Sequence, residues 1–284
     1  MATPIRVLSL GAGVQSSVVL LMSCCGDLPK LNAAVFADTQ WEPRAVYDHL
    51  AWLEVEAARA GIPVHRVTAG SLRERLLGSR ALVQGESGSR FVSLPLYVRN
   101  EDGSDGIMRR QCTKEFKIEP IERFIRRELL GLAPGQRAPA GAVEHWYGIS
   151  ADELRRARQS SHAWEMKEYP LIGLPLRYLA QPYTRAACLD WFKRRYPHRA
   201  LPRSSCIGCP FHNNAEWRAI RAVPEEWADA IDFDRRIRKL RCGMRGTAYL
   251  HADRKPLDEV DLRTDEERGQ LTLKLGDCFG ECGV

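Results

Sequence analysis

The sequence predicts an α/β fold built on a mostly parallel, twisted sheet. Three short apolar runs, at residues 5–10, 31–37 and 64–67, alternate with longer segments of helical periodicity. Glycine, proline or polar residues separate these segments. This β-α-β-α-β order is typical of a parallel sheet that helices cover on both faces.

The first elements follow one another closely. Buried strands and amphipathic helices are expected in alternation at residues 5–10, 17–25, 31–37, 43–60 and 64–67. Gly26 and Pro29 end the first helix. Asp38 and Thr39 follow the second strand directly, which is where ligands bind in open parallel sheets.

The middle of the chain interrupts this rhythm and then resumes it. Residues 78–106 are rich in glycine, serine and polar side chains, which favours a loop that either lies across a site or remains a surface loop. The next elements are expected to be a helix, a linker and a strand, at residues 114–130, 131–141 and 142–149. A helix then begins at Ser150, with Glu153 in the capping-box position.

The C-terminal part is expected to be helical and rich in cysteine. Helices are predicted at residues 184–196, with Thr184 as N-cap, and at 215–240, interrupted by Pro224. A cysteine loop at 204–211 separates them. We place one boundary near residue 210, between an α/β domain at 1–210 and a helical region with a cysteine-containing tail at 211–284.

Composition indicates a soluble globular protein. The chain has 284 residues, of which 44% are hydrophobic and 27% charged. No apolar run approaches the roughly 20 residues of a membrane span, so we expect no membrane partner and a cytoplasmic location. The net charge of +6 suits nucleic acid, nucleotides or other anions, and equally a solvated basic surface. The sequence predicts no particular oligomeric state.

The most informative stretch is Gly11-Ala12-Gly13-Val14-Gln15-Ser16-Ser17, between the first strand and the first helix. Glycines let the backbone approach an anion, and the start of the helix offers unpaired N–H groups beside the serine hydroxyls. The stretch therefore predicts a phosphate-binding turn, with Ser9 at the end of the preceding strand. Neither the Gly-Lys-Ser/Thr of P-loops nor the Gly-x-Gly-x-x-Gly dinucleotide pattern is present. A glycine turn without a ligand is the alternative.

Nine cysteines in a chain expected in the cytoplasm suggest metal or redox chemistry. Cys206-Ile207-Gly208-Cys209-Pro210 has the spacing of a zinc knuckle or an iron–sulfur site. Cys112 and Cys188 would complete a four-thiolate set, and inert buried thiols are the alternative.

Two cations flank Cys112 in the sequence. Arg109 and Lys117 are spaced to face an anion beside that metal site, or are solvated surface charges. His212 favours a packing role over metal ligation.

In this order the motifs resemble the phosphoadenosine phosphosulfate (PAPS) reductase family, which belongs to the PP-loop superfamily of adenine-nucleotide α-hydrolase-like proteins. Motif order from residue 5 to 212 carries the resemblance. The motifs are the glycine turn, Asp38-Thr39, Arg109 with Cys112 and Lys117-Ile118-Glu119-Pro120, the run from Gly148 to Arg155, and Cys206 with Cys209.

The resemblance implies a Rossmann-like PP-loop fold that binds an adenine nucleotide, either ATP or a sulfonucleotide (PAPS or adenylyl sulfate). Its nucleotide site would comprise Ser9, Gly11, Ala12, Gly13, Val14, Gln15, Ser16, Ser17, Asp38 and Thr39. It also implies a [4Fe-4S] cluster on Cys112, Cys206, Cys209 and Cys188. Zinc is the alternative metal.

The tail adds a catalytic candidate. Glu281-Cys282-Gly283 resembles the motif whose cysteine attacks sulfur in sulfonucleotide reductases, which makes Cys282, with Lys117 and Arg109, the expected catalytic set. Gln15 stands where ATP-splitting members carry aspartate, and it favours the reductases. Thr113 stands where cluster-bearing reductases carry a second cysteine, and this difference leaves the fourth ligand open.

Three functions therefore remain open. The first is reduction of a sulfonucleotide with a thiol reductant. The second is ATP- and Mg²⁺-dependent sulfur transfer from a sulfur donor to nucleic acid, as in DNA phosphorothioation or tRNA thiolation, with the basic residues 235–241 as the contact. The third is a non-catalytic nucleotide- or nucleic-acid-binding module with structural zinc.

Overall fold

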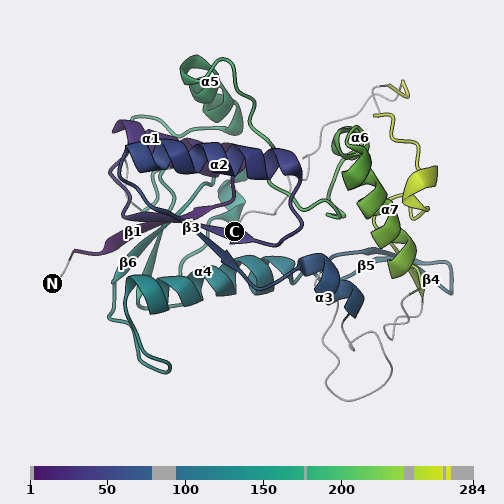
Figure 1. The fold of residues 1–284 in the computed structure, drawn as a ribbon, viewed down its shortest axis with the longest axis horizontal. Coiled ribbons are helices and arrows are strands. Elements are labelled where there is room, and N and C mark those ends of the chain that lie inside the picture. The colour runs from purple at the N-terminus through teal and green to yellow at the C-terminus, as the bar shows by residue number, and fades with distance from the viewer. Residues whose placement is uncertain (1–2, 79–93, 176–177, 240–245, 265–266, 270–284) are drawn as a thin grey trace.

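A central five-stranded parallel sheet organises the molecule (Figure 1). The computed structural model describes residues 3–78, 94–175, 178–239, 246–264 and 267–269. The strand order is β3-β2-β1-β6-β7, with bounds β1 Ile5–Leu10, β2 Ala33–Asp38, β3 Val64–Thr68, β6 Val143–Tyr147 and β7 Glu165–Glu168. The expected α/β fold with a mostly parallel sheet is confirmed.

Two helices, α1 (Val14–Cys25) and α2 (Arg44–Arg59), cover one face of this sheet, and a longer helical segment covers the other (Figure 1). Helix α5 (Arg185–Arg195) packs on α1 and α2. On the opposite face, π-helical turns η2 (Lys114–Ile118) and η3 (Ile125–Leu129) flank α4 (Glu119–Phe124). No helix of the described residues is long and apolar enough to cross a membrane.

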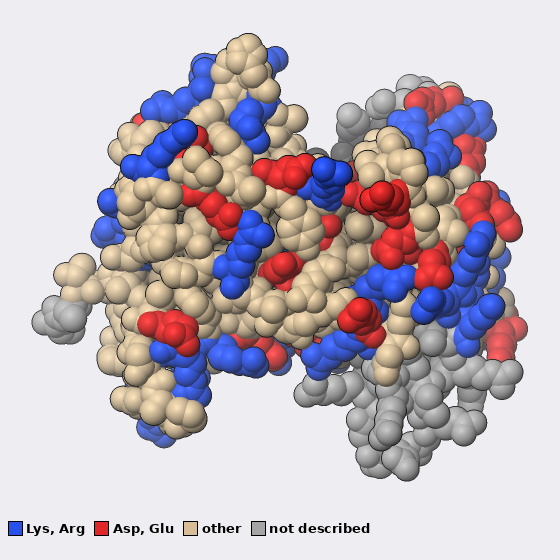
Figure 2. Space-filling model, viewed as in Figure 1, with Lys and Arg blue, Asp and Glu red and all other residues tan. Residues whose placement is uncertain are grey.

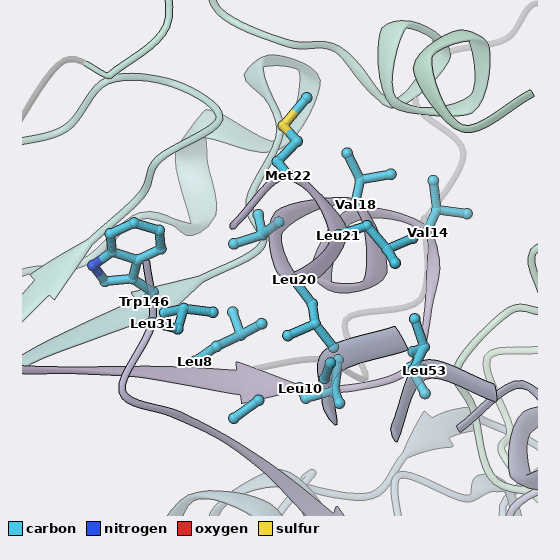
Figure 3. Packing of buried hydrophobic residues seen from close by; sticks show 14 of the residues in the cluster. Leu8, Leu10, Val14, Val18, Leu20, Leu21, Met22, Leu31, Leu53 and Trp146 are labelled. Atoms are coloured by element: carbon cyan, nitrogen blue, oxygen red, sulfur yellow. The ribbon is translucent and has the colours of Figure 1, made fainter. Parts of the chain in front are cut away.

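Helix α1 forms the centre of the largest hydrophobic cluster (Figure 3). Leu8 and Leu10 of β1 lie beneath it, and Leu20 of α1 packs against that layer with no exposed surface. Alternate residues of β1 point the other way, so Val7 belongs to the cluster under α4. Helix α1 ends at Gly26, whose φ of 87° stops the helix as expected.

A second, smaller sheet joins segments that are far apart in the sequence. Strand β4 (Tyr97–Asn100) pairs with β5 (Asp105–Ile107) on one side and with β8 (Gly246–Tyr249) on the other, all antiparallel. The prediction of a loop at 78–106 is wrong for the residues of β4 and β5, which form a hairpin. Residues 79–93 lie outside the described residues. Backbone hydrogen bonds between these strands hold the segment in the sheet, and its polar composition did not predict them.

A second hydrophobic core lies beside the small sheet. It collects buried residues of α3 (Leu72–Gly78), α6 (Asn214–Arg221), α7 (Pro224–Ile237), β8 and the 3₁₀ turn η5 (Leu257–Glu259). Trp41 and Trp217 are both buried in it, so segments from both sides of residue 210 share this core. The helices expected at 215–240 are confirmed, with Pro224 at the first turn of α7.

Candidate functional site

A pocket of about 290 Å³ opens where the carboxyl ends of β1 and β6 lie side by side. Strand β2, the next strand in the sequence, pairs with β1 on one side, and β6 pairs with β1 on the other side. In open parallel sheets such a reversal of strand order leaves a crevice that binds ligands. The pocket therefore occupies the position that the topology favours for a ligand.

The glycine turn forms the floor of this pocket. Gly11, Gly13 and Ser16 line it, and Ala12 beneath them is fully buried with φ of 53°. Gly13 is the N-cap of α1, whose first turn carries no acidic residue and no side-chain cap. The start of α1 consequently retains N–H donors and a positive dipole end.

Close approaches of other segments explain the glycines. A Cβ on Gly148, just after β6, would lie 2.6 Å from the backbone nitrogen of Ser16. A Cβ on Gly13 would lie 3.0 Å from Cβ of Ser204, in the loop before the cysteines. The turn, the end of β6 and this loop thus meet at the pocket floor. The Ser204 hydroxyl is buried there and has no hydrogen-bond partner among the described residues.

Gln15 connects three elements around the pocket. Its amide nitrogen donates to Ser150 Oγ and to Glu153 Oε2, each at 3.2 Å. Its amide oxygen accepts a hydrogen bond from Arg185 Nη1 at 3.2 Å. Ser150 is the N-cap residue of η4 (Ala151–Arg156) but makes no cap bond with its side chain. The predicted capping box is therefore wrong, because Gln15 bonds both of its members.

Cations outnumber anions around the pocket. Lys117, Arg156, Arg185 and Arg203 line it, together with the acidic residues Glu153 and Glu216. Arg156 pairs with Glu153 at 2.9 Å, and Arg203 pairs with Glu216. An apolar wall completes the lining, formed by Leu10, Val14, Phe36, Ala37, Ile118 and Ile121. Positive charge beside an apolar wall suits an anion that carries an aromatic or apolar group.

Most of the predicted anion-binding residues are brought together here. The predicted residues that line the pocket are Ser9, Gly11, Gly13, Val14, Gln15, Ser16 and Lys117. Ser17 is instead buried, and its hydroxyl lies 3.0 Å from His49 Nε2 on α2. Arg109 is exposed and outside the pocket lining.

Asp38 and Thr39, which follow β2, form hydrogen bonds with residues outside the pocket lining. Asp38 accepts hydrogen bonds from the Tyr47 hydroxyl at 2.8 Å and from the Gln40 backbone at 2.7 Å. Thr39 bonds Glu42 at 3.1 Å and lies 3.3 Å from Cys206 Sγ. Neither residue lines the pocket, so the structure does not bring them into the nucleotide set predicted for them.

Cys206 and Cys209 lie in a buried turn next to the pocket loop. The Cys209 amide donates to the Cys206 carbonyl at 3.0 Å, and the His212 ring donates to the same carbonyl at 2.9 Å. Gly208 faces the Trp41 ring so closely that a Cβ would overlap it. Burial lowers the pKa of His212 to about 4, so this histidine is a neutral support of the turn, as expected.

The buried carboxylate of Glu42 lies next to the Cys206 thiol. The Cys206 thiol donates to Glu42 Oε1 at 3.5 Å, and Lys117 Nζ lies 3.6 Å from that oxygen. Lys117 also lines the pocket, so its side chain links the pocket to the cysteine turn, as does the loop that carries Ser204.

The four predicted cluster ligands do not converge. Cys112 is partly buried against the second core, to which Cys206 belongs, whereas Cys188 lies in the core around α1. Burial, with nearby Asp152, raises the pKa of Cys188 to about 12. Within the described ranges, no group of three or more His, Cys, Asp or Glu side chains is placed to hold a metal ion. Cys188 does not complete a ligand set with Cys206, and Cys282 lies outside the described residues.

A hydrogen-bonded chain that the sequence did not reveal reaches the pocket. Ser9 Oγ lies 3.0 Å from His145 Nε2, and His145 Nδ1 lies 2.5 Å from Glu165 Oε1. Tyr147 and Ser160 hydroxyls also donate to the Glu165 carboxylate, at 3.2 and 2.5 Å. Ser9, His145 and Tyr147 line the pocket. The signal available in the sequence was a histidine in the middle of the strand predicted at 142–149; in the structure every residue of β6 is buried.

The hydrogen bonds and charges around Glu165 determine the protonation state of its carboxyl group. Burial by itself raises the pKa of Glu165, but hydrogen bonds and charge from His145, with Ser160 and Lys167, outweigh burial and lower the pKa to about 2. Glu165 is therefore ionised and accepts the proton on His145 Nδ1.

Comparison with known proteins gives no family for the chain. No protein-family model matches it, and no curated protein matches it. Fold and site together define an α/β protein with a pocket at the carboxyl edge of a parallel sheet, lined by four basic and two acidic side chains.

Proposed function

We propose that the chain is an adenine-nucleotide-dependent enzyme of sulfur chemistry, similar to PAPS reductases. The position of the pocket carries this proposal, because the glycine turn, the start of α1 and basic side chains meet where strand order reverses. The glycine turn and α1 would hold the phosphate or sulfate. The apolar wall that includes Phe36 and Ile121 would take the base.

The size of the pocket limits the ligand. Pockets for small molecules typically range from about 300 to 1,000 Å³. At about 290 Å³ the pocket lies at the lower end of this range, and a mononucleotide is the ligand size we propose for it. With a mononucleotide in the pocket, nucleic acid would bind, if at all, on the surface around the opening.

Reduction of a sulfonucleotide is the reaction we favour. Gln15 carries no charge, and its amide nitrogen is committed to Ser150 and Glu153, so it does not offer the carboxylate that ATP-splitting loops provide for a metal. In the reduction, the Cys282 thiolate forms a bond to the sulfate sulfur, and the sulfur–oxygen bond to the nucleotide breaks. The nucleotide leaves with the bonding electrons, and a thiol reductant then releases sulfite from the cysteine.

The metal is a separate part of the proposal. A [4Fe-4S] cluster on Cys112, Cys206 and Cys209 would supply redox or electrostatic chemistry beside Lys117. The described residues do not fit a complete four-cysteine set, because Cys188 belongs to another core. We therefore assign no reaction step to a cluster.

Of the predicted contact at residues 235–241 the structure describes 235–239, and the pairing of three of its arginines does not favour the sulfur-transfer alternative. Arg235 pairs with Asp258, Arg236 with Asp232 and Arg238 with Asp234. Figure 2 shows basic and acidic side chains interspersed over α7. Charges paired in this way leave little potential for a phosphate backbone.

Ligand binding tests the pocket directly. We expect adenylyl sulfate or PAPS to bind more tightly than inorganic sulfate in isothermal titration calorimetry. Arg185→Ala should weaken the binding by at least about tenfold, because one charge-assisted contact contributes about 1.5 kcal/mol or more. Arg235→Ala is the matched control and should bind like the wild type, since Arg235 is exposed on α7. Equal affinity in both variants would contradict the assignment of the pocket.

Product analysis tests the reaction. Anaerobically prepared protein should release sulfite from a sulfonucleotide in the presence of a dithiol, and Cys282→Ser should abolish this release while nucleotide binding persists. Pyrophosphate or AMP release from ATP that requires nucleic acid would instead establish sulfur transfer. Full reductase activity in Cys282→Ser would remove that cysteine from the mechanism.

A further inference from the structure

We propose that Ser9, His145 and Glu165 form a nucleophilic triad in which Ser9 attacks phosphorus in a ligand bound in the pocket. The three side chains come from adjacent strands β1, β6 and β7. The triad is a different apparatus from the cysteine chemistry above. Its natural substrate class, a nucleotide phosphoanhydride or phosphosulfate, rests on the proposed function.

Geometry is the first argument. Ser9 Oγ to His145 Nε2 is 3.0 Å, and His145 Nδ1 to Glu165 Oε1 is 2.5 Å. A nucleophilic serine requires a base within hydrogen-bond reach and a third group that orients the base. Both distances meet these requirements, and His145 would act as the base in its neutral form, with Nδ1–H donating to Glu165 and Nε2 facing Ser9.

Access is the second argument. His145 and Glu165 have exposed fractions of only 1% and 4%, whereas Ser9 is half-buried and lines the pocket. The base and the orienting acid are shielded from water, and the hydroxyl meets the ligand space. Only Leu10 separates Ser9 from the glycine turn, and Ser9 lines the same pocket as Gly11 and Gly13, so an anion on that turn would lie near the hydroxyl.

The molecule contains a matched pair that lacks these features. Ser17 Oγ also lies 3.0 Å from a histidine Nε2, that of His49. His49 Nδ1 has no hydrogen-bond partner among the described residues, and Ser17 is fully buried outside the pocket lining. Burial lowers the pKa of His49 to about 4. Only the Ser9 pair combines an orienting carboxylate with access to the pocket.

The chemical step balances without a further reactant except water. Ser9 Oγ forms a bond to phosphorus, the bond from phosphorus to pyrophosphate or sulfate breaks, and that group leaves with the bonding electrons. The hydroxyl proton passes to His145 Nε2 and departs with the leaving anion. Water then cleaves the serine–phosphorus bond, its hydroxyl goes to phosphorus, and its proton returns to Ser9 through His145.

A fluorophosphonate tests the triad without any nucleotide. In this reaction Ser9 Oγ bonds to phosphorus, fluoride leaves with the bonding electrons, and the proton passes to His145. We expect peptide mapping of the full chain to find the adduct on Ser9, with Ser17 unmodified in the same molecule. Ser9→Ala should abolish labelling, and Ser17→Ala should leave its rate unchanged.

Further variants separate the base from its positioning residue. His145→Gln should slow labelling by at least about 100-fold, the lower range for general-base catalysis. Glu165→Gln should slow it by at least about tenfold, and Glu165→Asp should restore part of the rate, which a purely structural role would not do. Circular dichroism and thermal unfolding establish that each variant is folded.

The outcomes distinguish this inference from the proposed function. Labelling of Ser9 in protein that binds no nucleotide would support the triad and refute the nucleotide pocket. Nucleotide binding with Ser9 no more reactive than Ser17 in the wild-type chain would overturn the triad alone. An equal labelling rate in folded His145→Gln would also overturn it.

Discussion

Gln15 Nε2 donates a hydrogen bond to Glu153 Oε2 over 3.2 Å, and this contact joins the first turn of α1 to the segment after β6. Both residues are buried and line the pocket. The glycine turn is thus held by a neutral amide between a carboxylate and the Arg185 guanidinium. Replacing that amide changes charge at the centre of the site without changing its shape.

Gln15→Glu should therefore destabilise the fold. The new carboxylate would face the Glu153 carboxylate and lose both amide donors, at a cost of about 1–3 kcal/mol in the free energy of unfolding. The loss should shrink at lower pH, where one of the two acids takes a proton. Urea unfolding at pH 7.5 and pH 5 measures it, and exposed Gln136→Glu is the control. Equal stability of the two variants at pH 7.5 would contradict the role of Gln15.

Gly148→Ala should damage both the fold and the pocket. Its Cβ would lie 2.6 Å from the Ser16 nitrogen, a backbone atom that moves only with α1 itself. We expect a loss of about 1–3 kcal/mol, as for other overpacked sites, together with weaker nucleotide binding. Gly78→Ala at the end of α3 has open space around it and should be neutral or slightly stabilising. Chemical denaturation of the two variants makes the comparison.

Leu20→Ala should be among the costly substitutions in the core. The side chain is completely buried between α1 and the sheet, as Figure 3 shows, and its removal leaves a cavity. Such truncations cost about 2–5 kcal/mol. Leu189→Ala on α5 is a matched control, since Leu189 is 42% exposed. A similar unfolding midpoint for both variants would place Leu20 outside the core.

Stability should depend on pH through Glu165. Its pKa in the folded chain is lowered to about 2 from an ordinary value of 4.5, so it contributes stability that is fully present above pH 4.5. This contribution is lost as the pH falls through the range from 4.5 to 2. The difference in unfolding free energy between wild type and Glu165→Gln should narrow across that range. A difference that stays constant between pH 4.5 and pH 2 would show that folding does not lower the pKa of Glu165.

Metal content should distinguish the cysteines. If the protein binds iron or zinc, anaerobic preparation followed by elemental analysis should show normal content in Cys188→Ala, because Cys188 is buried in the core around α1. Cys206→Ser and Cys209→Ser should reduce the content strongly. Loss of metal in folded Cys188→Ala would restore that residue as a ligand. A colourless zinc protein would exclude the cluster.

Most of the central sheet could be predicted because its strands and helices are short, strongly periodic segments, but β7 was not predicted. Hydrophobic spacing gave β1, β2 and β3 within a few residues. Strand β4 was missed, since Val98 is its only buried residue and its partner β8 begins at Gly246. Pairing over such a distance depends on tertiary contacts and leaves no local signal.

The site was partly predictable for a related reason. A glycine turn before a helix has a local pattern, and the structure puts most of it in the pocket. Cys188 was assigned to complete a four-thiolate set, but the side chain is buried in the core around α1. The chain from Ser9 through His145 to Glu165 needs the order of β1, β6 and β7, which spacing along the sequence does not contain.

The pairing of β4 with β8 also has a consequence for synthesis on the ribosome. All strands of the large sheet are present once residue 168 has been made, so that sheet can form early. Strand β4 must wait until residue 249 for its second neighbour. Until then Trp41 and Leu72 lack much of their apolar cover. The nascent chain therefore exposes apolar surface while residues 169–249 are translated, the interval in which it is most prone to aggregate.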